Sequence, residues 1–187
     1  KIISYGFIST GNLNEKTARI YADHLLFTAN KQIMDDADKI FHYLENPKSG
    51  IQILKDCKLL IPGPVFTRKE IAKLIQNEIH HAQQKKPAAI TLKMNSLSDE
   101  ELISMLNDAA RAGVEIKLII RGIFCMYSEN PKFRKPIAAV SVVDEYLEHA
   151  RVFIFHNDGK EKVFISSADW MVRNLDHRVE ATCPILD

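Results

Sequence analysis

Residues 88–122 read AAITLKMNSLSDEELISMLNDAARAGVEIKLIIRG and alternate between strand-like and helical patterns. The apolar runs Ala88–Met94 and Val114–Ile120 each predict a strand. Between them, Ser98 and the glutamate three residues later form a capping-box signature for a helix that ends near Arg111. A strand, a helix and a second strand in this order are typical of an α/β protein.

The segments on either side give the same kinds of signal. Helices are predicted at Asp35–Leu44, at Thr67–Lys85, where Thr67 and Glu70 form a second capping box, and at Asp144–Glu148 as a short turn. Further strands are predicted at Lys1–Ile8, Tyr21–Thr28, Lys58–Ile61, Ala139–Val143, Val152–Phe155, Val163–Ile165 and Arg178–Cys183. We therefore expect an α/β fold with a mixed, largely parallel sheet flanked by helices.

Two stretches rich in turn-forming residues, Asn46–Gly50 and Pro62–Pro64, interrupt the apolar pattern. We place a domain boundary between them, so that one region covers residues 1–55 and another covers residues 56–187. Because the chain starts with Lys1 and already reads as a strand at Ile2, we expect it to be a piece of a longer protein.

The composition excludes several classes of protein. The 187 residues are 46% hydrophobic and 26% charged, which is ordinary for a globular protein. A formal net charge of +1 gives no overall attraction to nucleic acid. No apolar run is long enough to span a membrane and no signal peptide is visible. Three widely spaced cysteines form neither a disulfide framework nor a zinc motif, which favours the cytoplasm.

His149 and Arg151 are the first candidates for chemistry. In an extended segment they point to the same face, so they can converge on one anion. An imidazole beside a permanent cation suits phosphoryl chemistry. The following strand ends at Ser166, Ser167 and Asp169. These three either shape a turn, orient His149 or donate to phosphate, and the sequence leaves the choice open.

The other polar candidates are weaker. Arg121 follows a predicted strand, where α/β proteins bind ligands, although a strand-end ion pair is the alternative. His80 and His81 lie on a polar helix face, and the remaining histidines lack metal-ligand spacing. Lys132–Lys135 is a basic loop, either solvated surface or a path for a polyanion.

An internal echo links two parts of the chain. Ile8-Ser9-Thr10-Gly11-Asn12 and Ile165-Ser166-Ser167-Ala168-Asp169 both stand at the end of a predicted strand, and basic and asparagine residues follow each. This repetition indicates a duplicated fold.

Long runs of the sequence resemble the polyphosphate kinases, bacterial enzymes of the phospholipase D-like superfamily. The resemblance covers nearly the whole chain, in order. The runs that carry it are Ser9–Tyr21 (STGNLNEKTARIY), Ile90–Leu97 (ITLKMNSL), Leu118–Gly122 (LIIRG) and Tyr146–His149 (YLEH) through Glu180.

The resemblance implies two related phospholipase D-like domains with the active site between them. Residues 1–55 would end the first domain, and residues 56–187 would form the second, truncated at its C-terminal end. His149 would be the catalytic acid/base, and Tyr21, Arg121 and His149 would contact the nucleotide. Arg151, Ser166, Ser167 and Asp169 would support the phosphate site.

Other family features would lie outside this chain. The histidine that carries the phosphoryl group belongs to an H-x-K motif upstream, and the arginines that hold Mg²⁺ also lie upstream of Lys1. The second motif reads H-x-R here, which keeps the charge. Phe7 stands where many relatives have a histidine, so that position carries no chemistry.

The expected reaction is reversible transfer of the terminal phosphoryl group of ATP to inorganic polyphosphate through a phosphohistidine. The resemblance also implies ATP or ADP and polyphosphate as partners, a homo-oligomer, no nucleic acid, no transmembrane segment, and a cytoplasmic location with a possible peripheral place at the inner membrane. The excised chain would be inactive. One alternative is a phosphodiesterase, which a phosphorylated nucleotide product would distinguish from the kinase. The other is a non-catalytic binding module, which an upstream H-x-K motif would disfavour. Without its own core, the region before the boundary is expected to be poorly anchored, with Tyr21 displaced.

Overall fold

The computed structural model describes residues 3–186, except for the side chain of Ser49. The helices are α1 (Lys31–Glu45), α2 (Pro47–Leu54), α3 (Phe66–Gln83) and α4 (Glu100–Ala112), with single helical turns at Thr17–Arg19, Asn157–Gly159 and Arg173–His177. The strands are β1 (Gly6–Ser9), β2 (Tyr21–Ala22), β3 (Leu25–Thr28), β4 (Ile61–Pro62), β5 (Ala89–Met94), β6 (Glu115–Ile120), β7 (Ala138–Val140), β8 (Leu147–Glu148), β9 (Arg151–Phe155), β10 (Lys162–Ser166) and β11 (Ala181–Ile185).

Seven strands form one sheet in the order β4-β11-β10-β9-β5-β6-β7. β5 pairs in parallel with β6, and β6 with β7, whereas the other four pairings are antiparallel. The expected α/β class and mixed sheet are confirmed. The sheet is not largely parallel, however, because β9 and β10 are joined only by residues 156–161, and a connection this short allows only antiparallel pairing.

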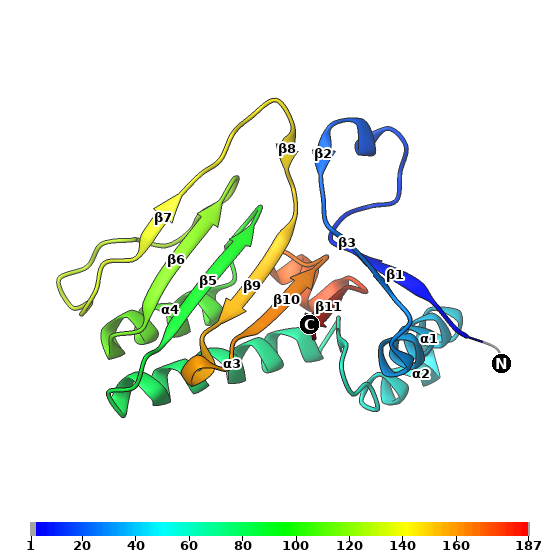
Figure 1. The fold of residues 1–187 in the computed structure, drawn as a ribbon, viewed down its shortest axis with the longest axis horizontal. Helices are drawn as coiled ribbons and strands as arrows, with labels where there is room; N and C mark the ends of the chain where they lie inside the picture. The colour runs from blue at the N-terminus through cyan, green and yellow to red at the C-terminus, as the bar shows by residue number, and fades with distance from the viewer. Residues whose placement is uncertain (1–2, 187) are drawn as a thin grey trace.

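The main core lies between this sheet and helices α3 and α4, which run along one of its faces (Figure 1). In β5 every second side chain enters the core, and Ile90, Leu92 and Met94 are at most 1% exposed. Trp170 is fully buried and its ring lies 5.5 Å from that of Phe153. This packing fixes the carboxyl ends of β5 and β6, from which polar side chains project.

The region before the predicted domain boundary at residues 55–56 packs on the opposite face of β10 and β11. Ile33 of α1 forms a buried cluster with Leu60, Ile165 and Cys183. The carboxylate of Asp36, also on α1, is fully buried and accepts the backbone N–H groups of Lys58, Leu59 and Leu60 at 2.7–3.1 Å. The expectation that this region is poorly anchored is therefore wrong, because its apolar side chains pack in one buried cluster with those of the second region.

Two helix starts differ from their predicted caps. Thr67 does not cap α3, because its buried hydroxyl makes no hydrogen bond within residues 3–186 and the helix starts after Val65. Asp99 rather than Ser98 caps α4, and its side chain accepts the backbone N–H of Leu102. Both helices nevertheless form close to their predicted ranges.

Three short segments also differ from their predictions. Asp144–Glu148 is not helical; its last two residues form β8, which pairs in parallel with β2. The helix predicted before Asn46–Gly50 does end there, at Glu45, but a second helix follows at once, with Pro47 in the first turn of α2, where its fixed φ is favourable. Tyr21–Thr28 is divided into β2 and β3, and Lys1 and Ile2 of the first predicted strand lie outside the described residues.

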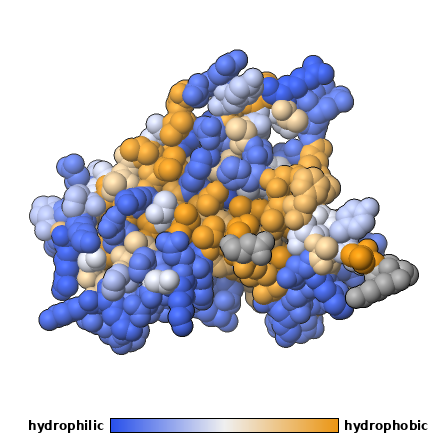
Figure 2. Space-filling view, in the orientation of Figure 1, coloured by the Kyte–Doolittle hydropathy of each residue, from blue (hydrophilic) through white to orange (hydrophobic). Residues whose placement is uncertain are grey.

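Apolar residues gather across the middle of the face shown in Figure 2, and hydrophilic residues line its lower edge, where Figure 1 places α3. Within residues 3–186, no helix combines the length and the apolar character needed to cross a membrane.

Candidate functional site

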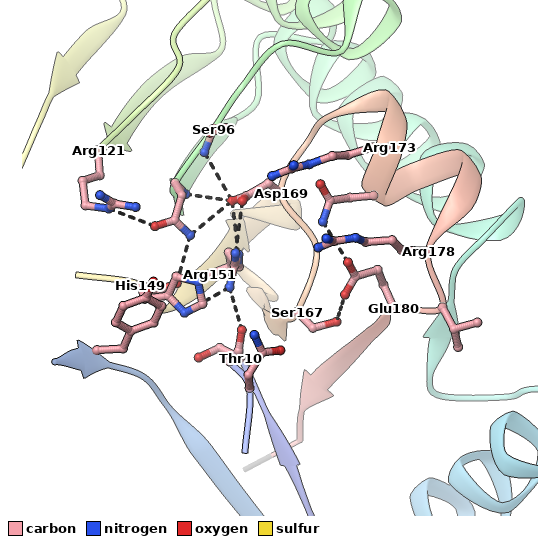
Figure 3. Close-up of a pocket in the computed structure, with 16 residues that line it drawn as sticks. Thr10, Ser96, Arg121, His149, Arg151, Ser167, Asp169, Arg173, Arg178 and Glu180 are labelled. Carbon is pink, nitrogen blue, oxygen red and sulfur yellow. Dashed lines mark hydrogen bonds and ion pairs between the residues drawn. The ribbon is translucent and has the colours of Figure 1, made fainter. Parts of the chain in front are cut away.

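A cavity of about 430 Å³ collects residues from segments far apart in the sequence. They lie in β2 and β9, follow β1, β5, β6 and β8, or belong to the stretch between β10 and β11. The lining residues are Thr10, Gly11, Asn12, Tyr21, Asn95, Ser96, Arg121, His149, Arg151, Ser167, Asp169, Arg173, Asn174, Arg178, Val179 and Glu180 (Figure 3). Arg121 and His149 therefore share one cavity, as expected from their places at strand ends.

Strand pairing brings Tyr21 to His149. β2 and β8 pair in parallel, and the backbone N–H of His149 donates to the carbonyl of Ala22 at 3.1 Å. The Tyr21 ring then lies beside the imidazole, with ring centroids 4.7 Å apart. Tyr21 is therefore not displaced, contrary to expectation.

An acid from the first region holds the imidazole. Nδ1 of His149 lies 3.0 Å from each carboxylate oxygen of Asp23, which also accepts the Thr10 hydroxyl at 2.7 Å. A Cβ atom at Gly11 would lie 2.0 Å from an Asp23 oxygen, so a glycine is needed there. The contact assigns the ring proton to Nδ1, which leaves the Nε2 lone pair free of hydrogen-bond partners within residues 3–186.

The charge state of His149 follows from its surroundings. Burial lowers the pKa of the imidazole below its ordinary value, and the positive charge of Arg151 lowers the pKa further, whereas Asp23 opposes both effects. The side chain is 13% exposed. His149 is consequently neutral at pH 7, with one nitrogen able to accept a proton.

Arg151 has its own carboxylate. Its guanidinium makes two bonds of 3.1 Å to Asp169, and Nη1 donates to the carbonyl of Thr10 at 2.7 Å. Burial would raise the pKa of Asp169, but Arg151 and the backbone N–H groups of Asn95 and Ser96 hold that pKa below its ordinary value. His149 and Arg151 are neighbours, but they do not converge on one anion, because separate acids hold them.

Asn95 links His149 to Arg121 through its side-chain amide. Its Nδ2 donates to the carbonyl of His149 at 3.2 Å, and its Oδ1 accepts Nε of Arg121 at 3.0 Å. Arg121 makes no ion pair within residues 3–186, so its guanidinium remains available to a ligand. Its ligand-binding role stays a prediction.

Ser166, the last residue of β10, and Ser167, which follows it, both have hydrogen-bond partners within the protein. The Ser166 hydroxyl is buried, lies 2.7 Å from that of Thr182 and accepts the Ala168 N–H, and it does not line the cavity. Ser167 does line the cavity, but its hydroxyl donates to Glu180. Asp169, by contrast, bonds Arg151 and the backbone N–H groups of Asn95 and Ser96. A role of the three residues at a bound phosphate stays a prediction.

Arg173 and Arg178 add two exposed cations to the cavity, and neither makes an ion pair within the described part of the chain. The helical turn Arg173–His177 is held against α3, because Arg68 of α3 bonds Asp176 of this turn and also Asp99. With Arg121, they give the cavity three arginines available to an anion such as a chain of phosphates.

Sequence reasoning did not select Asp23, Asn95 or Glu180, and it placed Arg173 and Arg178 only in the internal echo. The echo contained a usable signal, because an acid follows the hydroxyl residue at the same distance in both copies. The partners of Asp23 and Asn95 lie too far away in the sequence for any local pattern to show them.

The residues described here do not make a magnesium site. The acids at or beside the cavity are already engaged, Asp23 by His149, Asp169 by Arg151, and Glu180 by Ser167 and Asn174. Nowhere in residues 3–186 do three or more acidic, histidine or cysteine side chains gather as a metal would require.

Two family models match the chain. Residues 1–50 match the polyphosphate kinase C-terminal domain 1, and residues 60–187 match the polyphosphate kinase C-terminal domain 2. A crystal structure of polyphosphate kinase from Porphyromonas gingivalis superposes with a TM-score of 0.90 at 44% identity, over 99% of this chain and 28% of that one.

Curated relatives agree. The polyphosphate kinase of Escherichia coli strain K12 is 41% identical over 187 residues, and that of Vibrio cholerae is 44% identical over the same length. The match covers all of this chain but only 27% and 26% of those proteins. Fold and site together define a protein of the phospholipase D-like class. Within that class, the chain belongs to the polyphosphate kinase family.

Proposed function

We propose that this chain forms part of the catalytic centre of an enzyme that reversibly transfers the terminal phosphoryl group of ATP to inorganic polyphosphate through a phosphohistidine. One observation carries the proposal. A neutral imidazole with a free Nε2 lines the same cavity as three arginines that have no carboxylate partner within residues 3–186. Such a cavity suits a polyanion whose transfer requires a proton acceptor or donor.

Each part has a distinct task in this reaction. His149 exchanges a proton at Nε2 with the oxygen that leaves or attacks the phosphoryl group, while Asp23 holds its Nδ1 proton. Arg121 offsets the charge on the phosphoryl oxygens, and Arg173 and Arg178 bind the neighbouring phosphates. The Tyr21 ring offers a flat aromatic surface for the nucleotide.

The remaining parts come from outside this chain. The imidazole that carries the phosphoryl group lies upstream, as do the groups that hold Mg²⁺, which would neutralise phosphate charge. ATP as phosphoryl donor favours a cytoplasmic location, and a homo-oligomer is the expected assembly. Residues 1–187 alone should not synthesise polyphosphate, since they lack the carrier.

The test is ATP-dependent polyphosphate formation by a full-length protein that carries this chain. His149→Ala should lower synthesis by about 10²- to 10⁴-fold, because it removes the proton acceptor. His80→Ala is the matched control, because this histidine is exposed and, within the described part of the chain, its side chain bonds only Gln84. Its synthesis should match the wild type, and thermal melts should show both variants folded.

Three outcomes would contradict the proposal. Near-wild-type synthesis by His149→Ala would remove the proton-transfer role. Cleavage of phosphodiesters by the wild type without polyphosphate formation would indicate a phosphodiesterase. Binding of ATP and polyphosphate without any turnover would indicate a binding module.

A further inference from the structure

The residues that follow β5 and β6 stay paired beyond the end of the sheet. The two strands run in parallel as far as their last partners, Met94 and Ile120. Just after them, the backbone N–H of Gly122 donates to the carbonyl of Asn95 at 2.7 Å. A Cβ atom at position 122 would lie only 3.0 Å from that carbonyl oxygen, so a glycine permits this close approach. Asn95 and Arg121 are therefore held side by side at the carboxyl ends of their strands.

The side-chain amide of Asn95 is fixed at both ends, and the residue is only 5% exposed. Its Nδ2 donates to the carbonyl of His149 at 3.2 Å and to the carboxylate of Asp169 at 3.4 Å. Its Oδ1 accepts Nε of Arg121 at 3.0 Å. A guanidinium nitrogen only donates, whereas a carbonyl and a carboxylate only accept, so turning the amide over would lose all three bonds. The amide therefore has one orientation, with its oxygen towards Arg121.

The bond to Asn95 orients the Arg121 guanidinium and leaves most of its donors free. A guanidinium is flat, and its N–H groups form a rigid fork. Because Nε is bonded to Oδ1 of Asn95, the plane of this fork cannot turn freely. Both Nη groups have no hydrogen-bond partner within residues 3–186, and the side chain lines the cavity. Arg121 therefore offers its remaining donors to a ligand in a defined direction.

The same amide relates Arg121 to His149. The backbone of His149 is held from two sides, since its carbonyl accepts Nδ2 of Asn95 and its N–H donates to the carbonyl of Ala22. In Figure 3, Arg121 and His149 lie on the same side of the view. The proposed function assigns both side chains to one phosphoryl group, Arg121 to its charge and His149 to its proton. A single amide thus bridges the residues that are to act together.

We propose that Asn95 is a positioning residue for phosphoryl transfer, which sets the direction of the Arg121 guanidinium relative to His149. The inference rests on the proposed function. Asn95 acts through Arg121, because its Oδ1 holds Nε so that both Nη groups meet the phosphoryl oxygens without reorganisation during the transfer. An amide suits this task, since it accepts a hydrogen bond without cancelling the charge of the arginine, whereas a carboxylate would form an ion pair.

The experiment is a double-mutant cycle on ATP-dependent polyphosphate formation by a full-length protein that carries this chain. Asn95→Ala removes the acceptor, and Arg121→Lys keeps the positive charge but removes Nε and the fork. Each substitution should lower kcat by about 10- to 100-fold, because the cation is present but misplaced. The KM for ATP should change by less than about threefold, since the charge remains. The double variant should lose at most about threefold more than the slower single variant, because both changes remove one bond.

Lys93→Met is the matched control. Lys93 lies on β5 two residues before Asn95, and its Nζ donates to the carbonyl of Ala150, next to the His149 carbonyl that Asn95 holds. Within residues 3–186 it neither lines the cavity nor bonds Arg121. The control removes a hydrogen bond to the same backbone segment but leaves the acceptor of Arg121 in place, so its kcat should stay within about threefold of the wild type. Thermal melts should show all variants folded.

The outcomes separate this assignment from the proposed function. A wild-type kcat in Asn95→Ala or in Arg121→Lys would overturn the role of Asn95 while the proposed function stands. Losses that multiply in the double variant would show that the two residues act independently, which would also overturn that role. So would an equal loss in Lys93→Met, or a loss in Asn95→Ala that only follows unfolding in the melts. A wild type that forms no polyphosphate from ATP would overturn both.

Discussion

Arg151 uses all three of its guanidinium nitrogens within the protein, two on Asp169 and one on the carbonyl of Thr10. Arg121 lines the same cavity, but its only side-chain hydrogen bond within the described residues goes to Asn95. Two arginines of one site thus have opposite functions. The first holds the site together, and the second is available to a ligand.

This difference predicts opposite mutant phenotypes. Arg151→Ala should lower the free energy of unfolding by about 3–5 kcal/mol, because it leaves the buried Asp169 carboxylate without its cationic partner. Arg121→Ala should lower it by about 1 kcal/mol or less and weaken ATP binding by about tenfold or more, because it removes a charged donor to phosphate. Urea denaturation and calorimetric ATP titration of the full-length protein measure the two effects. Equal destabilisation by both substitutions would contradict this division.

The protonation of His149 is a second residue-scale prediction. Burial and Arg151 lower the pKa of this imidazole, so its titration by NMR should have a midpoint below 6.5. Asp23→Asn should lower the midpoint further, because Asp23 raises the pKa. As the pH falls, His149 is therefore protonated in the unfolded chain before it is protonated in the folded chain. Its contribution to stability is complete above pH 6.5 and is lost as the pH drops towards the folded-state pKa. A midpoint above 6.5 in the wild type would refute the electrostatic account.

At the scale of elements, Asp36 joins α1 to the linker of residues 55–60, which leads into β4. Its buried carboxylate accepts three backbone N–H groups of that linker and pairs with Lys39 at 2.9 Å. Asp35, its neighbour, makes an exposed pair with Lys31. The two adjacent aspartates therefore form a matched test of how the first region is held.

Asp36→Ala should lower the free energy of unfolding by about 3–5 kcal/mol, because it leaves three linker N–H groups unpaired and removes the anionic partner of Lys39. Asp35→Ala should change it by at most about 0.5 kcal/mol, as is usual for exposed ion pairs. Chemical denaturation of the 187-residue chain measures both values. If the two variants proved equally stable, the linker would not depend on Asp36.

Elements with strong local patterns could be predicted from the sequence. β5, α4 and β6 were predictable because the alternation of buried side chains and the glycine at the helix end are local signals. β8 was not, because its two residues become a strand only through pairing with β2, more than a hundred positions earlier. Asp23 was missed for the same reason, since its bond to His149 spans 126 positions.

At the scale of the whole molecule, duplication organises the site. The antiparallel pairs β1/β3 and β10/β11 have the same register. In each, the hydroxyl residue after the first strand donates to an acid, Thr10 to Asp23 and Ser167 to Glu180. Asp23 accepts a hydrogen bond from His149, and Glu180 accepts hydrogen bonds from Ser167 and Asn174. The chain spans only about a quarter of the length of the curated relatives it matches.

The most direct test is a pulse of [γ-³²P]ATP given to a full-length protein that carries this chain, followed by a chase with unlabelled ATP. The account predicts a phosphoryl group on protein histidine, stable in alkali and lost in acid, that the chase moves quantitatively into polyphosphate. Polyphosphate that becomes labelled without any phosphorylated protein, at times shorter than one turnover, would contradict transfer through an imidazole.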